Sequence, residues 1–143
     1  MSRSGGRSLR FVVVTRNPGK AREFEKIFSE RGLRFRVEPM ETPEIQSEDL
    51  REVAGRSALY AYDVLREPVM VEDAGLFIEA LNGFPGPFSS YVYKTIGVEG
   101  ILKLMRGVED RRARFISVIA FYSPITEPVK FFTGEVEGYI SEE

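Results

Sequence analysis

The chain has 143 residues, a formal net charge of −2, and 43% hydrophobic residues, which suits one domain with its own core and argues against disorder. It contains no Cys and no His, so disulfides, thiolate nucleophiles, Cys/His zinc sites and Ser-His-Asp machinery are excluded. The chemistry that remains uses carboxylates, Lys and Arg, hydroxyls, and a hard metal such as Mg²⁺ or Mn²⁺.

The first ten residues, MSRSGGRSLR, are basic and rich in Gly and Ser. They lack the apolar stretch of a secretory signal, and no apolar run in the chain approaches the roughly 20 residues of a membrane span. We therefore expect a flexible start over residues 1–8, one domain over residues 1–143, no membrane partner, and a cytoplasmic location.

The next segments predict a strand, a helix and a second strand. Residues 9–14, LRFVVV, form a short Val-rich run that is typical of a buried strand. Asn17 is a candidate N-cap and Pro18 suits the first helical position. The predicted helix ends at Gly32 and has one apolar face, made of Ala21, Phe24, Ile27 and Phe28. Residues 33–40 alternate between apolar and polar side chains, as a strand does.

An acidic loop over residues 41–49 precedes the clearest helix, for which we expect Ser47 to be the cap. The small side chains of this helix predict close packing on a sheet, over a face made of Leu50, Val53, Ala54, Ser57, Ala58, Ala61, Val64 and Leu65. Residues 68–73 predict a short strand that ends in two acids. The structure of residues 74–81 is left open.

Residues 82–90 predict a turn-rich loop, and residues 90–106 predict one or two helices broken near Gly97. Two late strands follow, over residues 113–123 and 128–140. The order of elements predicts an α/β or α+β fold, with a mixed sheet covered by helices. Ligands of such sheets bind beyond the carboxyl ends of strands, where the turn after residue 14 and the acids at 72 and 73 are expected.

Charge is distributed unevenly along the chain. Residues 1–36 contain ten Lys or Arg and three Asp or Glu, whereas residues 37–79 contain three Lys or Arg and eleven Asp or Glu. This polarity suits a site where basic groups bind phosphates and acids bind their metal. Solvated helix faces of opposite sign are the alternative interpretation. No nucleic-acid motif accompanies the basic segment, so we expect no nucleic-acid partner.

The turn Thr15–Lys20 is the first candidate site. A strand that leads into a helix directs backbone N–H groups and the helix dipole at one place, which favours an anion. Thr15 and Asn17 add neutral donors, and Lys20 adds a mobile positive charge. The Gly and Lys spacing of a Walker loop is absent. The alternative is an Asn-Pro-Gly turn that only caps the helix.

Three carboxylates could hold a metal. Glu44 lies in the acidic loop, and Glu72 and Asp73 close the third predicted strand. Because neighbouring strand residues point to opposite faces, we expect only one of Glu72 and Asp73 to point into a site. A carboxylate beside a metal can orient or deprotonate water. Arg56, on the second helix, could contact phosphate. Solvated surface side chains and a turn cap are the alternatives.

Together these motifs resemble the inosine/xanthosine triphosphate pyrophosphatase (Ham1-like) family. The resemblance runs from about residue 9 to the end of the chain. It rests on four motifs in register: T-x-N-x-x-K from Thr15, PEIQ around Glu44, VEDAGL around Asp73, and LNGFPGPFSSY from Leu81.

The resemblance implies Mg²⁺-dependent hydrolysis of non-standard purine nucleoside triphosphates to the monophosphate and pyrophosphate, by a homodimer. Asp73 would activate water, and Glu44 and Asp73, with Glu72 as a further candidate, would hold Mg²⁺ or Mn²⁺. The implied substrate contacts are Thr15, Arg16, Asn17, Pro18, Gly19, Lys20, Arg56 and Ala74.

Three departures from the family pattern stand out. Arg16 replaces a small residue, Arg56 replaces a common Lys, and the sequence ends at Glu143 where the family continues with a segment like GFGYDP and a Ser-His-Arg stretch. We therefore expect a fold that is incomplete at its carboxyl-terminal side. A catalytically impaired, homodimeric nucleotide-binding protein is the alternative function.

Overall fold

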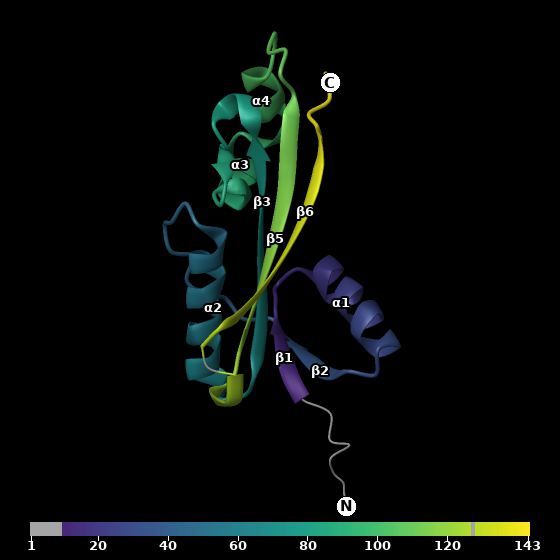
Figure 1. Cartoon of the computed structure of the whole chain (residues 1–143), viewed down its shortest axis with the longest axis vertical. Coiled ribbons are helices and arrows are strands. Elements are labelled where there is room, and N and C mark those ends of the chain that lie inside the picture. The colour runs from purple at the N-terminus through teal and green to yellow at the C-terminus, as the bar shows by residue number, and fades with distance from the viewer. Residues whose placement is uncertain (1–9, 127) are drawn as a thin grey trace, which may run out of the picture. The chain divides into compact units, whose positions relative to one another are not determined.

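The computed structural model describes residues 10–126 and 128–143 (Figure 1). The chain divides into two compact units, which we describe separately. The first comprises Met1–Glu44, Gly55–Val71 and Ala120–Lys130, and the second comprises Ile45–Ala54, Glu72–Ile119 and Phe131–Glu143. The predicted flexible start, residues 1–8, lies outside the described residues, and the prediction of a single domain stays a prediction.

One sheet has the strand order β2-β1-β3-β5-β6, and β4 pairs with β3. β1 is parallel to both β2 and β3, whereas β4 is antiparallel to β3, so the mixed sheet is confirmed. The strands are β1 (Arg10–Val14), β2 (Arg34–Glu38), β3 (Val69–Ile78), β4 (Pro85–Gly86), β5 (Arg112–Tyr122) and β6 (Lys130–Tyr139).

The described residues form four α-helices, as the mixed α/β prediction requires. None of the described helices is long and apolar enough to cross a membrane. The helices are α1 (Pro18–Glu30), α2 (Leu50–Leu65), α3 (Ser89–Thr95) and α4 (Gly97–Leu104), and two short 3₁₀ turns cover Glu79–Leu81 and Pro124–Thr126.

In the first unit, α1 and the part of α2 from residue 55 onward lie on opposite sides of β1 (Figure 1). Val12 and Val13 are 0% and 1% exposed, as expected for a central parallel strand covered on both faces. On the α1 side, the rings of Phe11 and Phe28 pack edge to face, with centroids 5.6 Å apart. On the α2 side, Tyr62 and Tyr122 pack in the same way at 5.1 Å.

Helix α1 begins and ends as its sequence predicts. Asn17 is the N-cap, Pro18 is the first helical residue, and Gly32 follows the last turn with a φ of 72°. The predicted apolar face is wrong at one position, because Ile27 is 50% exposed. Phe28 makes the contacts to the sheet instead, with Phe11 on β1 and Phe35 on β2.

Helix α2 buries the predicted face, since Leu50, Val53, Ala54, Ala58 and Ala61 are all at most 5% exposed. Small residues at these positions permit the helix to approach its neighbours closely. Only the end of the face departs from prediction: Leu65 is half-buried and Val64 is 54% exposed.

The predicted cap of α2 was wrong. Asp49, directly before the helix, accepts a hydrogen bond from the Arg51 amide at 2.9 Å. Ser47 lies two residues earlier, where its hydroxyl accepts from the Asp49 amide at 3.1 Å and donates to Glu52 at 2.5 Å. Asp49 therefore caps the helix by accepting a hydrogen bond from a backbone amide of its first turn, and Ser47 stabilises the turn that precedes the helix.

The prediction that the third strand ends at residue 73 was also wrong. β3 continues for ten residues, from Val69 to Ile78, and Glu72 and Asp73 lie inside it. The two acids suggested an exposed end because charged residues rarely sit within a buried strand. Both are half-buried here, and a neighbouring strand supplies a hydrogen-bond donor to Glu72.

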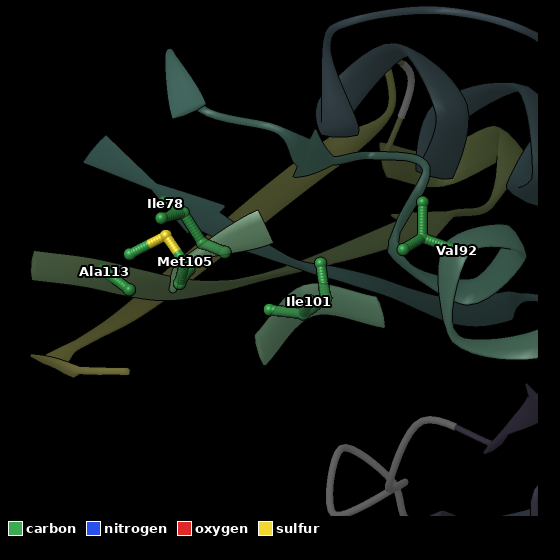
Figure 2. Packing of buried hydrophobic residues seen from close by; sticks show 5 residues of the cluster. All are labelled: Ile78, Val92, Ile101, Met105 and Ala113. Carbon is green, nitrogen blue, oxygen red and sulfur yellow. The ribbon is translucent and has the colours of Figure 1, made fainter. Parts of the chain in front are cut away.

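The core of the second unit forms between β3, β5 and the pair α3 and α4. Met105 lies beside Ile78 and Ala113 in this cluster (Figure 2), and both Met105 and Ile78 are 0% exposed. The predicted helix break is confirmed at Gly97, which has a φ of 68°. Val92 of α3 and Ile101 of α4 complete the buried cluster.

Hydrogen bonds and strand pairing hold the loop over residues 82–90 against β3, whereas its turn-rich sequence predicted only a loop. Leu76 and Gly86 are register partners, and the Ser89 hydroxyl accepts from the Leu76 amide at 2.8 Å and donates to the Gly86 carbonyl at 2.7 Å. A Cβ at Gly75 would lie 2.2 Å from that carbonyl oxygen. Gly75 therefore permits the backbone contact that fixes the loop.

Candidate active site

The turn Thr15–Lys20 belongs to the first unit and follows β1 directly. The Thr15 hydroxyl accepts from the Asn17 amide at 3.1 Å, and Asn17 Oδ1 accepts from the Lys20 amide at 3.1 Å. These two bonds bring Thr15, Asn17 and Lys20 together in one turn, as predicted. Thr15, Gly19 and Lys20 are half-buried, whereas Arg16, Asn17 and Pro18 are exposed.

The same bonds show that two of the backbone amides predicted to collect in this turn are used by the turn itself. The amides of Asn17 and Lys20 are bonded to side chains, because Asn17 is a true N-cap and Thr15 stabilises the turn before it. The turn also carries three side-chain donor groups: the Thr15 hydroxyl, the NH₂ of Asn17 and the Lys20 ammonium. The cap and an anion site are therefore compatible.

Two arginines differ in their surroundings. Arg16 forms an exposed ion pair with Glu41, with 3.3 Å between Nη1 and Oε1. An exposed pair of this kind is weak, so a phosphate could replace Glu41 as its partner. Arg56 is exposed on α2. Each arginine is thus accessible to an anion from solvent.

Arg36 on β2 accounts for part of the basic excess in the first segment of the chain. Its guanidinium donates to Glu67 and to Glu38, each at 2.7 Å. These hydrogen bonds raise the pKa of Arg36 above its ordinary value. Arg36 therefore links two carboxylates, those of Glu38 and Glu67, within the first unit.

The acidic pair Glu72 and Asp73 belongs to the second unit. Asp73 Oδ1 accepts from the amide of Ala74 at 3.1 Å, and Glu72 Oε2 accepts from the Ser117 hydroxyl at 2.5 Å. Adjacent residues of a strand point to opposite faces, so these two carboxylates diverge. The loop expected around Glu44 is present, and Glu44 is exposed in it, within the first unit.

Carboxylate oxygens are the donor type that Mg²⁺ and Mn²⁺ prefer. In residues 10–126 and 128–143, no group of three or more Asp, Glu, His or Cys side chains is gathered as a metal site. Mg²⁺ commonly takes only one or two carboxylates and completes its shell with water and substrate phosphates. Glu72 and Asp73 are hard oxygen donors of this kind, and because they diverge, only one of them can face a given ion.

Sequence reasoning missed Ser117, which contacts Glu72 from 45 residues away. No local pattern marks it, because an isolated Ser within a strand is compatible with any half-buried surface. Only the adjacency of β3 and β5 brings the two side chains together.

A family model described as the Ham1 family matches residues 11–143, which include the turn and every acid discussed above. The chain belongs to the Ham1 family. A Ham1 relative of Methanopyrus kandleri, a dITP/XTP pyrophosphatase, is 49% identical over 135 residues, which cover 94% of this chain and 71% of that protein. A dITP/XTP pyrophosphatase of Pyrococcus horikoshii is 48% identical over 135 residues, with 94% and 72% covered.

Solved Ham1 structures show the same fold. The Ham1 protein of Staphylococcus aureus matches with a TM-score of 0.77 and 29% identity, over 93% of this chain and 72% of that one. A HAM1 protein from Coxiella burnetii matches with a TM-score of 0.81 and 26% identity, over 94% and 74%. The family resemblance and the α/β fold predicted from the sequence are therefore confirmed.

Proposed function

We propose that this chain hydrolyses non-standard purine nucleoside triphosphates, such as the triphosphates of deoxyinosine, inosine and xanthosine, to the monophosphate and pyrophosphate. The observation that carries the proposal is the 49% identity to a dITP/XTP pyrophosphatase over 94% of the chain. The matched span contains the donor-rich turn and the acids, whose chemistry suits a phosphate substrate.

The turn Thr15–Lys20 and Arg56 would bind the triphosphate. A hydroxyl, a carboxamide and an ammonium in one turn offer neutral and charged donors to phosphate oxygens. Backbone at Pro18 and Gly19 would line the same contact, with Arg16 and Ala74 as further substrate neighbours. Charge-assisted hydrogen bonds of this kind stabilise the charge on phosphate oxygens in the ground and transition states.

Asp73 would accept the proton of the attacking water. As that proton leaves, the water oxygen forms a bond to the α-phosphorus, and the bond from the α-phosphorus to the bridging oxygen breaks, which releases pyrophosphate. Glu44 and Asp73, with Glu72 as a further candidate, are the residues that would supply carboxylate oxygens to Mg²⁺, or to Mn²⁺ in its place. The bound ion supplies neutralisation of phosphate charge and a lower pKa for water.

The direct test is pyrophosphate release from dITP, XTP and ATP, each with Mg²⁺ and with a chelator. We expect release from dITP and XTP, much slower release from ATP, and none without the metal. Equal rates with the three nucleotides would contradict the substrate class. Binding of dITP without release would favour the alternative of a nucleotide-binding protein.

Replacing Lys20 by Ala tests the phosphate contact. The helix cap at Asn17 uses the backbone of Lys20 and is retained, so the fold should persist. Loss of one charge-assisted contact of about 1.5–3 kcal/mol should raise the dissociation constant for dITP by roughly tenfold or more, as measured by calorimetry. Lys26→Ala, an exposed position on the same helix, is the control. Equal affinity in both variants would favour a turn that only caps α1.

We include a homodimer and a cytoplasmic location in the proposal. Tyr91 and Tyr93 on α3 are each 70% exposed, and Val98 on α4 is 60% exposed. Large side chains with exposed apolar surface favour a protein contact, and a second copy agrees with the family resemblance. The cytoplasm holds the free nucleotides on which such an enzyme acts. Light scattering should give twice the mass of the chain, and a monomer mass would contradict the dimer.

A further inference from the structure

Strand β6 buries little of its own surface. It is the last strand in the order β2-β1-β3-β5-β6, so among the described strands it pairs with β5 alone. All residues from Phe132 to Tyr139 are exposed, and the side chains of Phe132, Val136 and Tyr139 are 61%, 70% and 79% exposed. Because apolar burial is the main favourable contribution to folding, it stabilises the position of β6 only weakly.

The charged contacts of β6 with its neighbours are also weak. At its start, the Arg51 guanidinium lies 4.6 Å from the centroid of the Phe131 ring. In its middle, Glu135 pairs with Arg114 at 3.6 Å, and both side chains are partly exposed to solvent. Contacts of these kinds at exposed positions contribute little to stability. Along its length, β6 therefore depends mainly on backbone pairing with β5.

The end of β6 is held in a different way, by the side chain of Arg111, which is only 11% exposed. Its Nη1 donates to the carbonyls of Met105 and Val108 at 2.7 and 3.1 Å, just after α4. Its Nε and Nη2 donate to the carbonyls of Ile140 and Ser141 at 2.9 and 2.6 Å, just after β6. One guanidinium thus joins the residues that follow α4 to the residues that follow β6.

This contact should be much stronger than those along the strand. Hydrogen bonds from an ionised donor are stronger than neutral ones, and the planar guanidinium holds its donors in a fixed arrangement. The Arg111 carbonyl also accepts from the Ile140 amide at 2.8 Å, and Ile140 packs against the buried cluster of the second unit. The chain is therefore fastened just after β6, and only loosely along β6 itself.

We infer that residues 131–142 form a strap that opens separately from the core of the second unit, and that the Arg111 guanidinium holds this strap closed. Regions with few buried contacts open at a lower free energy than that of global unfolding. The buried cluster around Ile78 and Met105 includes no residue of β6, so it can stay packed while the strap is open. The inference does not depend on the proposed enzymatic function.

The alternative is that the strap and the core unfold as one unit, in which Arg111 is only a buried charge with satisfied hydrogen bonds. Hydrogen exchange of the backbone amides, followed by NMR at increasing urea concentration, distinguishes the two. For a separate strap, we expect amides of β6 that bond to β5 to be about a hundredfold less protected than amides of β3. Their exchange should also depend less on urea, because opening the strap exposes less surface than global unfolding.

Replacing Arg111 by Ala should lower the protection of the β6 amides by about 10- to 100-fold, the effect of losing a hydrogen bond to a charged donor. The control is Arg112→Ala, the next residue, whose exposed guanidinium donates to Asp110 at 2.9 and 2.8 Å. The control should change the protection of β6 by less than about twofold. Arg111→Lys keeps the charge without the planar fork, and should lose at least about fivefold.

Equal protection and equal urea dependence for β6 and β3 in the parent would overturn the separate strap. Equal protection of β6 in Arg111→Ala and Arg112→Ala would overturn the role of Arg111. If Arg111→Ala does not fold, Arg111→Lys takes its place, and protection equal to that of the parent would show that the four carbonyl contacts do not hold the strap.

Discussion

Replacing Asp73 by Asn is expected to reduce pyrophosphate release from dITP by about a hundredfold or more, the usual effect of losing a general base. An amide cannot accept the proton of the attacking water at neutral pH. The variant should still fold, because the carboxamide oxygen of Asn can accept from the Ala74 amide as Asp73 does, at 3.1 Å. The measurement pairs the turnover rate with the dissociation constant for dITP, which should change much less than the rate.

The control for this variant is Asp63→Asn, an exposed acid on α2 that pairs only weakly with Arg66 at 3.2 Å. Its turnover should equal that of the parent. Equal turnover in Asp73→Asn and the parent would rule out Asp73 as the base. A chelator should abolish release in the parent as well, because negatively charged phosphates and carboxylates repel each other without a cation.

Replacing Ile78 by Ala is expected to lower the free energy of unfolding by about 2–5 kcal/mol, the usual cost of such a truncation in a core. Ile78 is 0% exposed and packs with Met105 and Ala113 in the second unit (Figure 2). The truncation leaves a cavity that these neighbours can only partly fill. Denaturant unfolding, followed by circular dichroism, measures the change.

The matched control is Ile125→Ala, the same truncation at a side chain that is 90% exposed. It should change the free energy of unfolding by no more than about 0.5 kcal/mol, as surface substitutions usually do. Similar values for the two variants would show that Ile78 does not lie in a packed core. A change in the slope of the transition would instead show that cooperativity had been altered.

Much of the candidate site could be predicted from the sequence because its parts are local. The turn Thr15–Lys20 depends on contacts two and three residues apart, namely Asn17 to Thr15 and Lys20 to Asn17. Pro18 and Gly32 have backbone angles that suit the start and the end of the same helix, α1. Four motifs in register, namely the turn, PEIQ, VEDAGL and LNGFPGPFSSY, carried the resemblance to the family, and the family model confirms it.

The cap of α2 was predicted wrongly because two neighbouring residues both suit the N-cap position. Both Ser47 and Asp49 are good capping residues, and sequence preference alone does not separate them. The structure selects Asp49 because the first helical residue is Leu50, which is 5% exposed and must reach the core. Burial of that apolar side chain sets the helix start, and the nearest polar residue becomes the cap.

The sequence by itself determined the order of strands and helices, the buried face of α2 and the donor-rich turn, because periodicity, caps and turns act over a few residues. The family followed from the resemblance of its four motifs. The tertiary structure alone decided that β3 continues past Glu72 and Asp73, and that Ser117 donates to Glu72. Charged residues favour solvent unless a partner satisfies them. That partner comes from another strand, 45 residues along the chain, so no local pattern could reveal it.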